Sequence, residues 1–481
     1  MRSLPVLKPF SLAGLSTAGP ACPEVATGAG DAQQVPRERR FHLEVFGCQM
    51  NKLDGEMLLA ELLEAGYLPT ETVRDAGVIL FNTCAVREHA ENRVFSKVGA
   101  LAAIKRRNPD TIIGVLGCSA QNHGETIFKR YPHVSVVCGP GEFLRLPELI
   151  EKARREGRAT ALDLDTSPRY SRKKNLGPTP AQAYVAVMRG CDQACTFCVV
   201  PRTRGREVSR SVREIVDECQ VLVDGGVREI TLLGQTVNSY GKRLAKRHAI
   251  GLHHVFHELQ KTEGLERIRF ITSHPKYMSP DLIDAMASLP KVCEYLHLPV
   301  QSGSDAVLER MLRNYTVDHY RRVVEACRDK IRGFALATDI IVGFCGETET
   351  EFHETERLLE ELPFQGAFVF KYSERQGTKA AELYRDDVPE DVKRSRHQLV
   401  LKLVEGLSLR NHQSRIGGIE EVLVEGRSRL DPERWTGRTR AFQIAVFPVG
   451  PGEKLEGRLV PVKIVGVTPL VLVGERVGPD R

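Results

Sequence analysis

Short apolar runs alternate with segments of helical spacing over most of the chain. The first three runs, in FHLEVFGC, AGVILFNTC and TIIGVLGC, are nearly continuous in apolar residues, as strands buried on both faces are. Each is followed by a segment whose apolar residues recur with helical periodicity. This alternation predicts an open parallel α/β sheet in the N-terminal part of the chain.

Six more strand-like runs follow, again separated by helical segments such as SVREIVDECQVLVDGG. They are AYVAVMRGC, REITLLGQ, RIRFITS, YLHLPVQ, ALATDIIVGF and GAFVFKYS. Six βα repeats predict a partial (β/α)6 TIM-like barrel. In such barrels the functional residues lie at the carboxyl ends of the strands and in the loops beyond them.

The last part of the chain has a different pattern. Residues 390–412 predict a connecting amphipathic helix, and the runs EEVLVEG, WTGRTRAFQIAVF and LVPVKIVGVTPLVLVGE predict a small β-barrel. We therefore expect five segments: a flexible tail at 1–40, an α/β domain at 41–160, a linker at 161–182, the partial barrel at 183–412 and the small barrel at 413–478.

Composition narrows the class of protein. The 481 residues are 42% hydrophobic and 27% charged, as in globular proteins of several domains. The formal net charge of +6 permits an anionic partner without requiring one. We find no signal peptide and no apolar run of membrane-spanning length, which predicts a cytoplasmic protein without a membrane partner. Twelve cysteines in a reducing compartment are expected to be metal ligands or buried thiols.

A cysteine follows each of the first three strand-like runs. Because the carboxyl ends of parallel strands meet at one edge of a sheet, Cys48, Cys84 and Cys118 are expected to lie together. They are too far apart in sequence for the close-set ligand pairs of a zinc finger. Three buried core thiols are the alternative interpretation. Cys138 ends a fourth similar run, and for it we favour a core thiol.

A second group of cysteines lies in RGCDQACTFCVVP, directly after the first strand of the predicted barrel. Cys191, Cys195 and Cys198 have the spacing C-x3-C-x2-C. A structural zinc ion has four protein ligands and a cubane cluster has four irons, so three thiolates leave one coordination position to be filled. Cys219 is a poor fourth ligand because it falls in the middle of a helical pattern.

Polar residues recur at the carboxyl ends of the other barrel strands. They are Gln235 and Asn238, Ser273 and His274, Gln301 and Ser302, and Lys371 and Ser373. Such residues either line a pocket or cap helices and satisfy loop backbone. We take Gln235, Asn238, Ser273 and Gln301 as the candidate cofactor-binding residues.

Two groups of arginines are candidate contacts for RNA phosphates, with a solvated charged surface as the alternative. One group follows the cysteine loop and comprises Arg202, Arg204, Arg206 and Arg210. The other lies in the small barrel, comprises Arg427, Arg429, Arg434, Arg438 and Arg440, and is interleaved with Trp435 and Phe442. Arginines beside aromatic rings suit RNA phosphates and base stacking.

The C-x3-C-x2-C loop after the first strand of a βα barrel resembles that of the radical S-adenosylmethionine enzymes. In that superfamily three cysteines bind three irons of a [4Fe-4S] cluster, and the fourth iron binds S-adenosylmethionine. The wider sequence resembles the tRNA methylthiotransferases of the MiaB family from residue 41 to about 475. The resemblance rests on VFGCQMNKLDGE, NTCAVRE, VLGCSAQ, YVAVMRGCDQACTFCVVPRTRGREVSR, EITLLGQTVNSY, RIRFITSHP, HLPVQSGS and TDIIVGF.

This resemblance implies a methylthiotransferase domain, a radical domain and a C-terminal TRAM domain. It also implies that Cys48, Cys84 and Cys118 bind an auxiliary [4Fe-4S] cluster, whereas Cys191, Cys195 and Cys198 bind the radical cluster. The family reaction is methylthiolation of C2 of N6-isopentenyladenosine at position 37 of tRNA. A carbon–sulfur bond at an inert aromatic C–H calls for a radical, because no side chain is basic enough to remove that proton.

The expected partners are tRNA carrying N6-isopentenyladenosine, a low-potential electron donor such as flavodoxin or ferredoxin, and a sulfur source. The chain departs from the usual family pattern at Thr236, Cys345, Glu374 and Gln376, none of which is a predicted ligand. Two alternatives are a methylthiotransferase acting on a ribosomal-protein aspartate and a non-catalytic, metal-stabilised RNA-binding protein.

Overall fold

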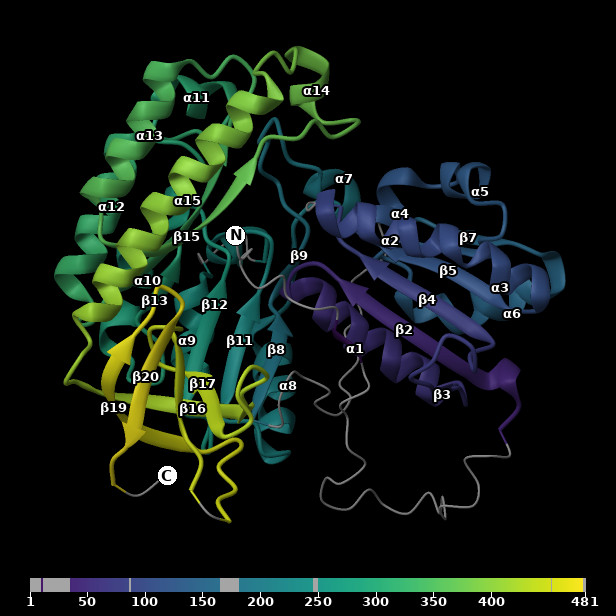
Figure 1. Cartoon of the computed structure of the whole chain (residues 1–481), viewed down its shortest axis with the longest axis horizontal. Helices are drawn as coiled ribbons and strands as arrows, with labels where there is room; N and C mark the ends of the chain where they lie inside the picture. Colours follow the sequence, from purple (N-terminus) through teal and green to yellow (C-terminus); the bar gives the residue numbers. More distant parts are fainter. Residues whose placement is uncertain are drawn as a thin grey trace. The chain divides into compact units, whose positions relative to one another are not determined.

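The computed structural model describes residues 10–11, 35–85, 88–164, 181–244, 250–450 and 452–478, so most of the predicted tail and linker lies outside the described residues. The chain divides into two compact units. Unit 1 consists of Met1–Lys173 and the short segment Val199–Arg206, and unit 2 consists of Lys174–Cys198 and Glu207–Arg481. Figure 1 shows their elements.

Unit 1 contains one sheet, and the prediction of an open parallel α/β sheet is confirmed. Its strand order is β1-β2-β4-β5-β6-β7, with β3 paired to β2, and every pairing is parallel except that of β1 with β2. The strands are β1 (Phe10–Ser11), β2 (Arg40–Phe46), β3 (Leu68–Pro69), β4 (Val78–Thr83), β5 (Ile112–Gly117), β6 (Val136–Cys138) and β7 (Ala159–Ala161). The helical elements are η3 (Arg37–Arg39), α1 (Gln49–Glu64), α2 (Glu88–Ala100), α3 (Ala102–Arg107), α4 (Cys118–His123), α5 (Thr126–Arg130), η4 (Phe143–Arg145), α6 (Leu146–Glu156) and α7 (Val200–Arg204).

The apolar runs of unit 1 become its central strands because both of their faces are covered. Every residue of β4 and β5 is buried, as expected of parallel strands between helices. On one face Ile79 and Phe81 of β4 pack in a core with Val94 of α2 and Ile113 of β5. The sheet is therefore rigid at the strand ends that carry the cysteines.

Unit 2 begins with the partial barrel, and the six predicted strands are confirmed. The six long strands form two parallel ladders, β12-β11-β8 and β13-β14-β15, and a parallel bridge between Ile268 and Val292 links the edge of the first ladder to the second. The strands are β8 (Gln182–Ala186), β9 (Met188–Arg189), β10 (Val208–Ser209), β11 (Glu229–Leu233), β12 (Arg267–Ile271), β13 (Tyr295–His297), β14 (Ala335–Val342) and β15 (Phe364–Lys371). The helical elements are α8 (Val212–Asp224), η5 (Val237–Ser239), α9 (Leu252–Leu259), η6 (Pro275–Tyr277), α10 (Pro280–Ser288), α11 (Asp305–Arg310), α12 (Val317–Lys330), α13 (Glu349–Glu361), α14 (Lys379–Leu383) and α15 (Glu390–Gln413).

Local sequence signals place the barrel helices. Helix α8 starts at a capping box in which the Ser211 hydroxyl accepts a hydrogen bond from the amide of Glu214 and the Glu214 carboxylate accepts one from the amide of Ser211. Its apolar face, with Ile215 and Cys219, is buried in the barrel core. Cys219 is fully buried there and packs among apolar side chains as a core thiol.

The C-terminal strands form a closed barrel in the order β16-β17-β18-β20-β19, which confirms the predicted small β-barrel. They are β16 (Ile419–Arg427), β17 (Arg434–Arg438), β18 (Ile444–Pro448), β19 (Leu459–Val467) and β20 (Val471–Arg476). The core of this barrel contains Trp435, packed with Val422 and Phe447. The predicted connecting helix is α15, 24 residues long, which packs along β15.

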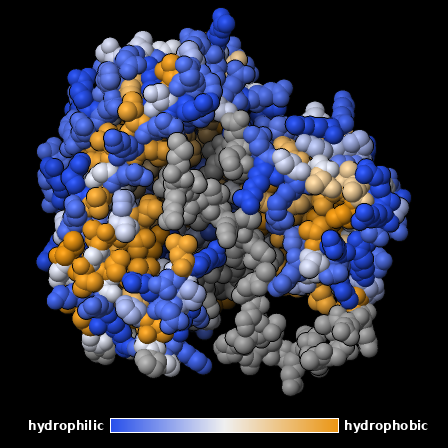
Figure 2. All heavy atoms as spheres, in the orientation of Figure 1, coloured by the Kyte–Doolittle hydropathy of each residue, from blue (hydrophilic) through white to orange (hydrophobic). Residues whose placement is uncertain are grey.

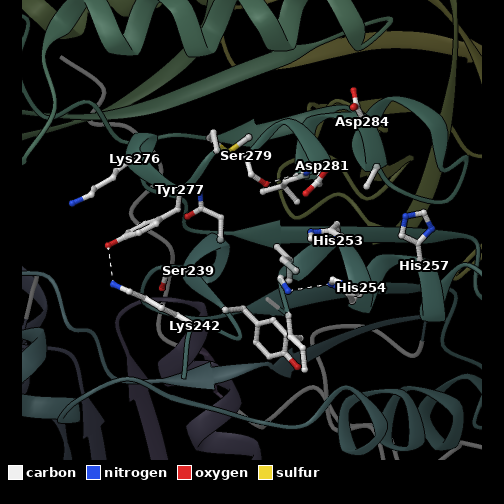
Figure 3. Close-up of a pocket in the computed structure, with 18 of the residues that line it drawn as sticks. Ser239, Lys242, His253, His254, His257, Lys276, Tyr277, Ser279, Asp281 and Asp284 are labelled. Carbon is white, nitrogen blue, oxygen red and sulfur yellow. Dashed lines mark hydrogen bonds between the residues drawn. The ribbon is translucent and has the colours of Figure 1, made fainter. Parts of the chain in front are cut away.

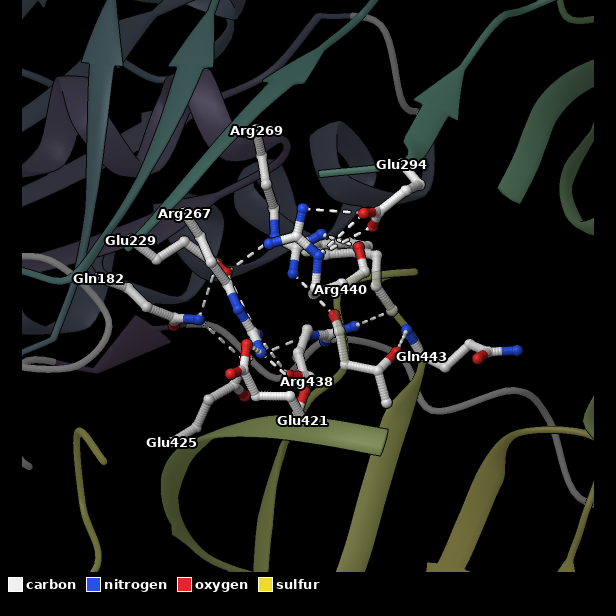
Figure 4. Close-up of polar contacts among 12 residues, drawn as sticks. Gln182, Glu229, Arg267, Arg269, Glu294, Glu421, Glu425, Arg438, Arg440 and Gln443 are labelled. Atoms are coloured by element: carbon white, nitrogen blue, oxygen red, sulfur yellow. Dashed lines mark hydrogen bonds and ion pairs between the residues drawn. The ribbon is translucent and has the colours of Figure 1, made fainter. Parts of the chain in front are cut away.

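Within unit 2 a buried charge network joins the partial barrel to the small barrel (Figure 4). Arg269 of β12 donates to the carbonyls of Thr439 and Arg440, both at 2.7 Å, and its Nε lies 2.9 Å from Glu229 of β11. Arg267 donates to the carbonyls of Arg438 (2.9 Å) and Glu421 (2.7 Å). Two buried guanidinium groups of one strand therefore bind backbone oxygens of the small barrel.

Figure 2 shows apolar and hydrophilic side chains interspersed over the small barrel on the face in view. The exposed apolar side chains of this barrel include Ile419, Val465 and Leu470. This face is therefore not a continuous basic surface. Among the helices in the described ranges, none combines the length and the apolar character needed to cross a membrane.

Candidate active site

The cysteine loop of unit 2 follows β9, and hydrogen-bond donors surround its thiols. The Cys191 Sγ lies 3.3 Å from the Thr236 hydroxyl and accepts a hydrogen bond of 3.4 Å from the backbone amide of Gln193. Burial raises the pKa of the Cys191 thiol, and these two contacts act in the opposite direction. The amide of Cys198 donates to the Cys195 carbonyl at 3.1 Å, which folds the loop into a turn.

Arg313 is a site residue that the sequence did not reveal. It follows α11, is buried, and donates from Nη1 to the Cys195 Sγ at 3.4 Å. Its other nitrogens bind the Tyr315 hydroxyl at 3.2 Å and the Pro299 carbonyl at 3.0 Å. The guanidinium is therefore fixed beside the thiols, where a positive charge stabilises thiolates. No local motif marks it, because it reaches the loop only through the tertiary fold.

The predicted cofactor-binding residues lie where the parallel strands end. Gln235 follows β11 and Ser273 follows β12, and the buried atoms Gln235 Oε1 and Ser273 Oγ have no hydrogen-bond partner within the described structure. Asn238 exchanges two hydrogen bonds with the backbone of His274, of 2.9 and 2.8 Å, and so joins the two loops. Gln301 is buried at φ 76° and continues the ladder to β14 through its backbone.

The thiols of the cysteine loop and the polar residues beside them are compatible with an iron–sulfur cluster that binds a polar cofactor. Buried polar atoms that lack partners are uncommon in folded proteins and point to a bound group. In the described parts of the chain, no three His, Cys, Asp or Glu side chains are arranged to hold one metal ion. A cubane cluster does not require that arrangement, because each thiolate binds a different iron.

An open pocket of about 920 Å³ lies beside the cysteine loop in unit 2 (Figure 3). Its wall includes Tyr277, whose hydroxyl accepts a 2.8 Å hydrogen bond from the Gln193 side chain of the loop. The Lys242 ammonium lies 5.3 Å from the centre of the Tyr277 ring, and Lys276 extends from the same wall. Burial and the neighbouring imidazole of His254 lower the pKa of His253. The pocket thus combines an aromatic ring with two lysines.

In unit 1 the second cysteine group lies at the ends of adjacent parallel strands. Cys48 caps α1 after β2, Cys84 follows β4, and Cys118 begins α4 after β5. Gly47 and Gly117 precede two of them with φ of +130° and +86°, respectively. A Cβ on Gly47 would lie 2.5 Å from the Cys84 Cβ, so glycine is needed for this close approach.

The cysteine side chains of unit 1 interact with one another. A hydrogen bond with the Cys84 thiol and the nearby Arg204 guanidinium lower the pKa of Cys48 to about 6, against the effect of burial. Burial raises the pKa of Cys118, and Arg204 opposes that shift. Cys138, at the end of β6, is fully buried, and its pKa is raised by burial. Cys48 and Cys118 therefore share the charge of Arg204, Cys84 interacts with Cys48, and Cys138 lies near a different pair of charges, Glu142 and Arg145.

The predicted tRNA-binding arginines differ in their surroundings. Arg202 and Arg206 are exposed, and their contact with tRNA stays a prediction. Arg204 is 4% exposed and paired with Asp54, so its guanidinium is not available to phosphates at the surface, contrary to expectation. Arg438 bonds Glu425 at 3.1 Å and lies 4.4 Å from the centre of the Phe442 ring.

The structure also shows the surroundings of Arg210 and of the four residues that depart from the family pattern. Arg210 is buried and its Nη1 lies 2.6 Å from Glu218. Cys345 is buried in a small core with Tyr372. Glu374 and Gln376 are exposed. The Thr236 hydroxyl lies 3.3 Å from the Sγ of a predicted cluster ligand, Cys191.

Family profiles match each folded part of the chain. The Radical SAM superfamily matches residues 185–359, the Uncharacterized protein family UPF0004 matches 40–139, and the TRAM domain matches 413–477. The structure of the radical S-adenosylmethionine methyltransferase TsrM from Kitasatospora setae, with cobalamin and a [4Fe-4S] cluster bound, has a similar fold. Its TM-score is 0.52 at 15% identity, over 71% of this chain and 77% of that chain. The barrel and its three-cysteine loop are those of a radical S-adenosylmethionine enzyme.

Relatives define the family more narrowly. A tRNA-2-methylthio-N(6)-dimethylallyladenosine synthase of Moorella thermoacetica is 41% identical over 455 residues, which cover 92% of this chain and 99% of the relative. The corresponding enzyme of Symbiobacterium thermophilum is 43% identical over 453 residues, 92% of this chain and 95% of the relative. The chain belongs to the family of tRNA-2-methylthio-N(6)-dimethylallyladenosine synthases, which are radical methylthiotransferases.

Proposed function

We propose that this protein adds a methylthio group to C2 of N6-isopentenyladenosine at position 37 of tRNA, giving 2-methylthio-N6-isopentenyladenosine. The observation that carries the proposal is the 41% identity to named enzymes over more than nine-tenths of the chain. The two cysteine groups support it, because one lies at the carboxyl ends of the parallel strands of unit 1 and the other follows the parallel strand β8 and the short strand β9 of unit 2. Radical formation and sulfur delivery would then be separate tasks of residues 183–412 and 41–160.

The loop of unit 2 has the properties needed to hold the cluster that binds S-adenosylmethionine. When both were bound, the reduced cluster would supply one electron and S-adenosylmethionine would supply the 5′-deoxyadenosyl radical that attacks unreactive C–H bonds. Arg313 and Thr236 hold the Cys195 and Cys191 sulfurs in place through contacts of 3.4 and 3.3 Å. Gln235 and Ser273 offer unpaired oxygens to the polar groups of the cofactor.

For unit 1 we propose an auxiliary [4Fe-4S] cluster on Cys48, Cys84 and Cys118. The lowered pKa of Cys48, about 6, favours the thiolate, which is the form that binds iron. Three protein ligands leave one iron open for added sulfur. We also propose a low-potential donor such as flavodoxin or ferredoxin, an external sulfur source and a cytoplasmic location.

The tRNA partner is supported by surfaces of unit 2. The small barrel matches the TRAM domain and carries exposed Arg427, which can contact a phosphate. The Arg427 guanidinium lies 3.8 Å from the centre of the Trp435 ring, but Trp435 is 2% exposed in the barrel core and offers no surface for base stacking, contrary to expectation. The pocket beside the cysteine loop places Lys242 and Lys276 around Tyr277. Cations beside aromatic rings are typical of sites that bind single-stranded RNA loops.

Alanine variants of one cysteine from each group test the proposal. Cys195→Ala should abolish both 5′-deoxyadenosine and methylthiolated tRNA, because both need the loop. Cys84→Ala should abolish methylthiolation while reductive cleavage of S-adenosylmethionine continues. Cys138→Ala is the matched control, since this buried thiol lies at a strand end of the same sheet and should leave both products unchanged.

The measurement is chromatographic quantification of 5′-deoxyadenosine and of the modified nucleoside. Anaerobically reconstituted protein receives dithionite, S-adenosylmethionine and tRNA that carries N6-isopentenyladenosine. Full methylthiolation by Cys84→Ala would refute the auxiliary site. A wild-type protein that cleaves S-adenosylmethionine but leaves this tRNA unmodified would refute the substrate assignment.

A further inference from the structure

Unit 1 contains a buried ion pair next to its three cysteines. Arg204 of α7 donates from Nη1 to Asp54 Oδ1 at 3.4 Å, and Nη2 makes a short contact with Asp54 Oδ2. Both side chains are nearly inaccessible, with side-chain exposures of 4% and 8%. Buried charges are costly unless they are paired, so this pair has a defined place in the fold.

Two of the cysteines lie close to the Arg204 end of this pair. The charge of Arg204 lowers the pKa of Cys48 and opposes the rise that burial causes in the pKa of Cys118. The segment is anchored in unit 1 by Val199, which packs with Ala85 and Cys118. The guanidinium is therefore held from two sides, by the packing of its own segment and by Asp54.

The charge balance of this site changes when the thiols become ligands. With neutral thiols, the single carboxylate of Asp54 already neutralises Arg204. Iron binds thiolates, so loading the site adds buried negative charge where Arg204 is the nearby cation. A one-electron reduction of a cluster there would add one more negative charge. Local charge and hydrogen bonds to sulfur are main determinants of cluster reduction potential.

We propose that Arg204 is a positioning residue of the auxiliary cluster site, where its buried charge raises the reduction potential of the cluster, and that Asp54 limits this effect by partly neutralising it. The inference rests on the proposed auxiliary cluster. It assigns opposite effects to the two members of one ion pair. A purely structural ion pair would not produce opposite shifts in potential.

Three variants of the full-length, cluster-loaded protein test this proposal. Arg204→Gln removes the positive charge and keeps a polar side chain, whereas Arg204→Lys keeps the positive charge. Asp54→Asn keeps the shape of the acid and removes its negative charge. The control is Arg202→Gln, an exposed arginine of the same short helix. The midpoint potential of the auxiliary cluster is measured by EPR-monitored redox titration, together with iron and sulfide content. S-adenosylmethionine distinguishes the clusters, because it perturbs the signal of only the cluster that binds it.

We expect the midpoint potential of the auxiliary cluster to be lower than wild type in Arg204→Gln and close to wild type in Arg204→Lys. It should be higher in Asp54→Asn and unchanged in Arg202→Gln. An unchanged potential in a fully loaded Arg204→Gln protein would overturn the proposal. If Arg204→Gln does not load the cluster, Asp54→Asn decides, since an unchanged or lower potential there overturns it too. A wild-type protein with a single cluster per chain would instead refute the proposed function.

Discussion

Replacing Arg269 by methionine should loosen the small barrel from the partial barrel. The substitution keeps an unbranched side chain but removes the guanidinium that binds the carbonyls of Thr439 and Arg440 and the carboxylate of Glu229. Two backbone oxygens lose their donor, and the buried carboxylate loses its closest cation. Arg267, whose Nη1 lies 3.8 Å from Glu229, compensates only in part.

The magnitude follows from the burial of the network. Removing one member of a buried ion pair costs about 3–5 kcal/mol, because the other charge stays buried without its partner. At about 1.4 kcal/mol for each factor of ten, this cost raises the equilibrium constant for opening of this contact by a factor of about 150 to about 4,000. The matched control is Arg321→Met, since Arg321 makes half-exposed pairs with Glu361 and Asp318. Such surface pairs contribute about 0–1 kcal/mol.

Hydrogen–deuterium exchange read by mass spectrometry is the assay, because it reports local opening in a protein whose unfolding is not two-state. Amides of the 439–443 turn and the flanking strands β17 and β18 should exchange faster in Arg269→Met. Exchange in the sheet of unit 1 should not change. If the turn exchanges as slowly in Arg269→Met as in Arg321→Met, the buried network does not hold the small barrel in place.

Three further outcomes are expected. Arg427→Gln should flatten the log–log salt dependence of tRNA affinity by about 0.7–0.9 for one lost phosphate contact, measured by filter binding at several salt concentrations; an unchanged slope would remove Arg427 from the interface. Thr236→Val should leave the radical cluster loaded but lower its midpoint potential, because the contact with the Cys191 sulfur is lost; an unchanged potential would contradict this role. Burial raises the pKa of Glu351, but hydrogen bonds, chiefly from Arg310, more than offset this and leave it below its usual value. The carboxylate therefore stabilises the fold above the unfolded pKa, and this contribution is lost as the pH falls through the lower folded pKa. Glu351→Gln should lower the melting temperature at neutral pH and converge with wild type in acid; a pH-independent difference would contradict the ionic origin.

The sequence predicted most of the architecture because apolar runs and helical periodicity are local signals. It predicted the parallel sheet of unit 1, the six barrel strands and the small C-terminal barrel. It did not predict β1, because a two-residue strand has no periodicity of its own. The alternation in RIRFI of β12 predicted a strand, but not that Arg267 and Arg269 would be buried.

For the site, the sequence identified both cysteine groups because their spacing and their positions after strands are local features. The side chains that tune them were missed. Arg313 reaches the Cys195 thiol from a distant part of the chain, so no spacing rule marks it. Asp54 lies on the helix that Cys48 caps, but only the tertiary fold pairs it with Arg204. The sequence left two interpretations of Arg204 open, a tRNA contact and a solvated charged surface, and both of them place it at the surface. Only tertiary structure reveals that Arg204 points inward to a carboxylate.

The contacts of Arg267 and Arg269 with the small barrel have a consequence for how this sequence can diverge. Four of their hydrogen bonds end on main-chain oxygens, those of Arg438, Thr439, Arg440 and Glu421, which every residue type carries. Substitutions in that turn can therefore accumulate without loss of these bonds, provided that the backbone keeps its path. The arginines of β12 have no such freedom. Over evolutionary time β12 should therefore vary little at these two positions, while the sequence of the turn that it binds changes. A small C-terminal barrel taken from a relative should dock on the partial barrel when its turn has the same length.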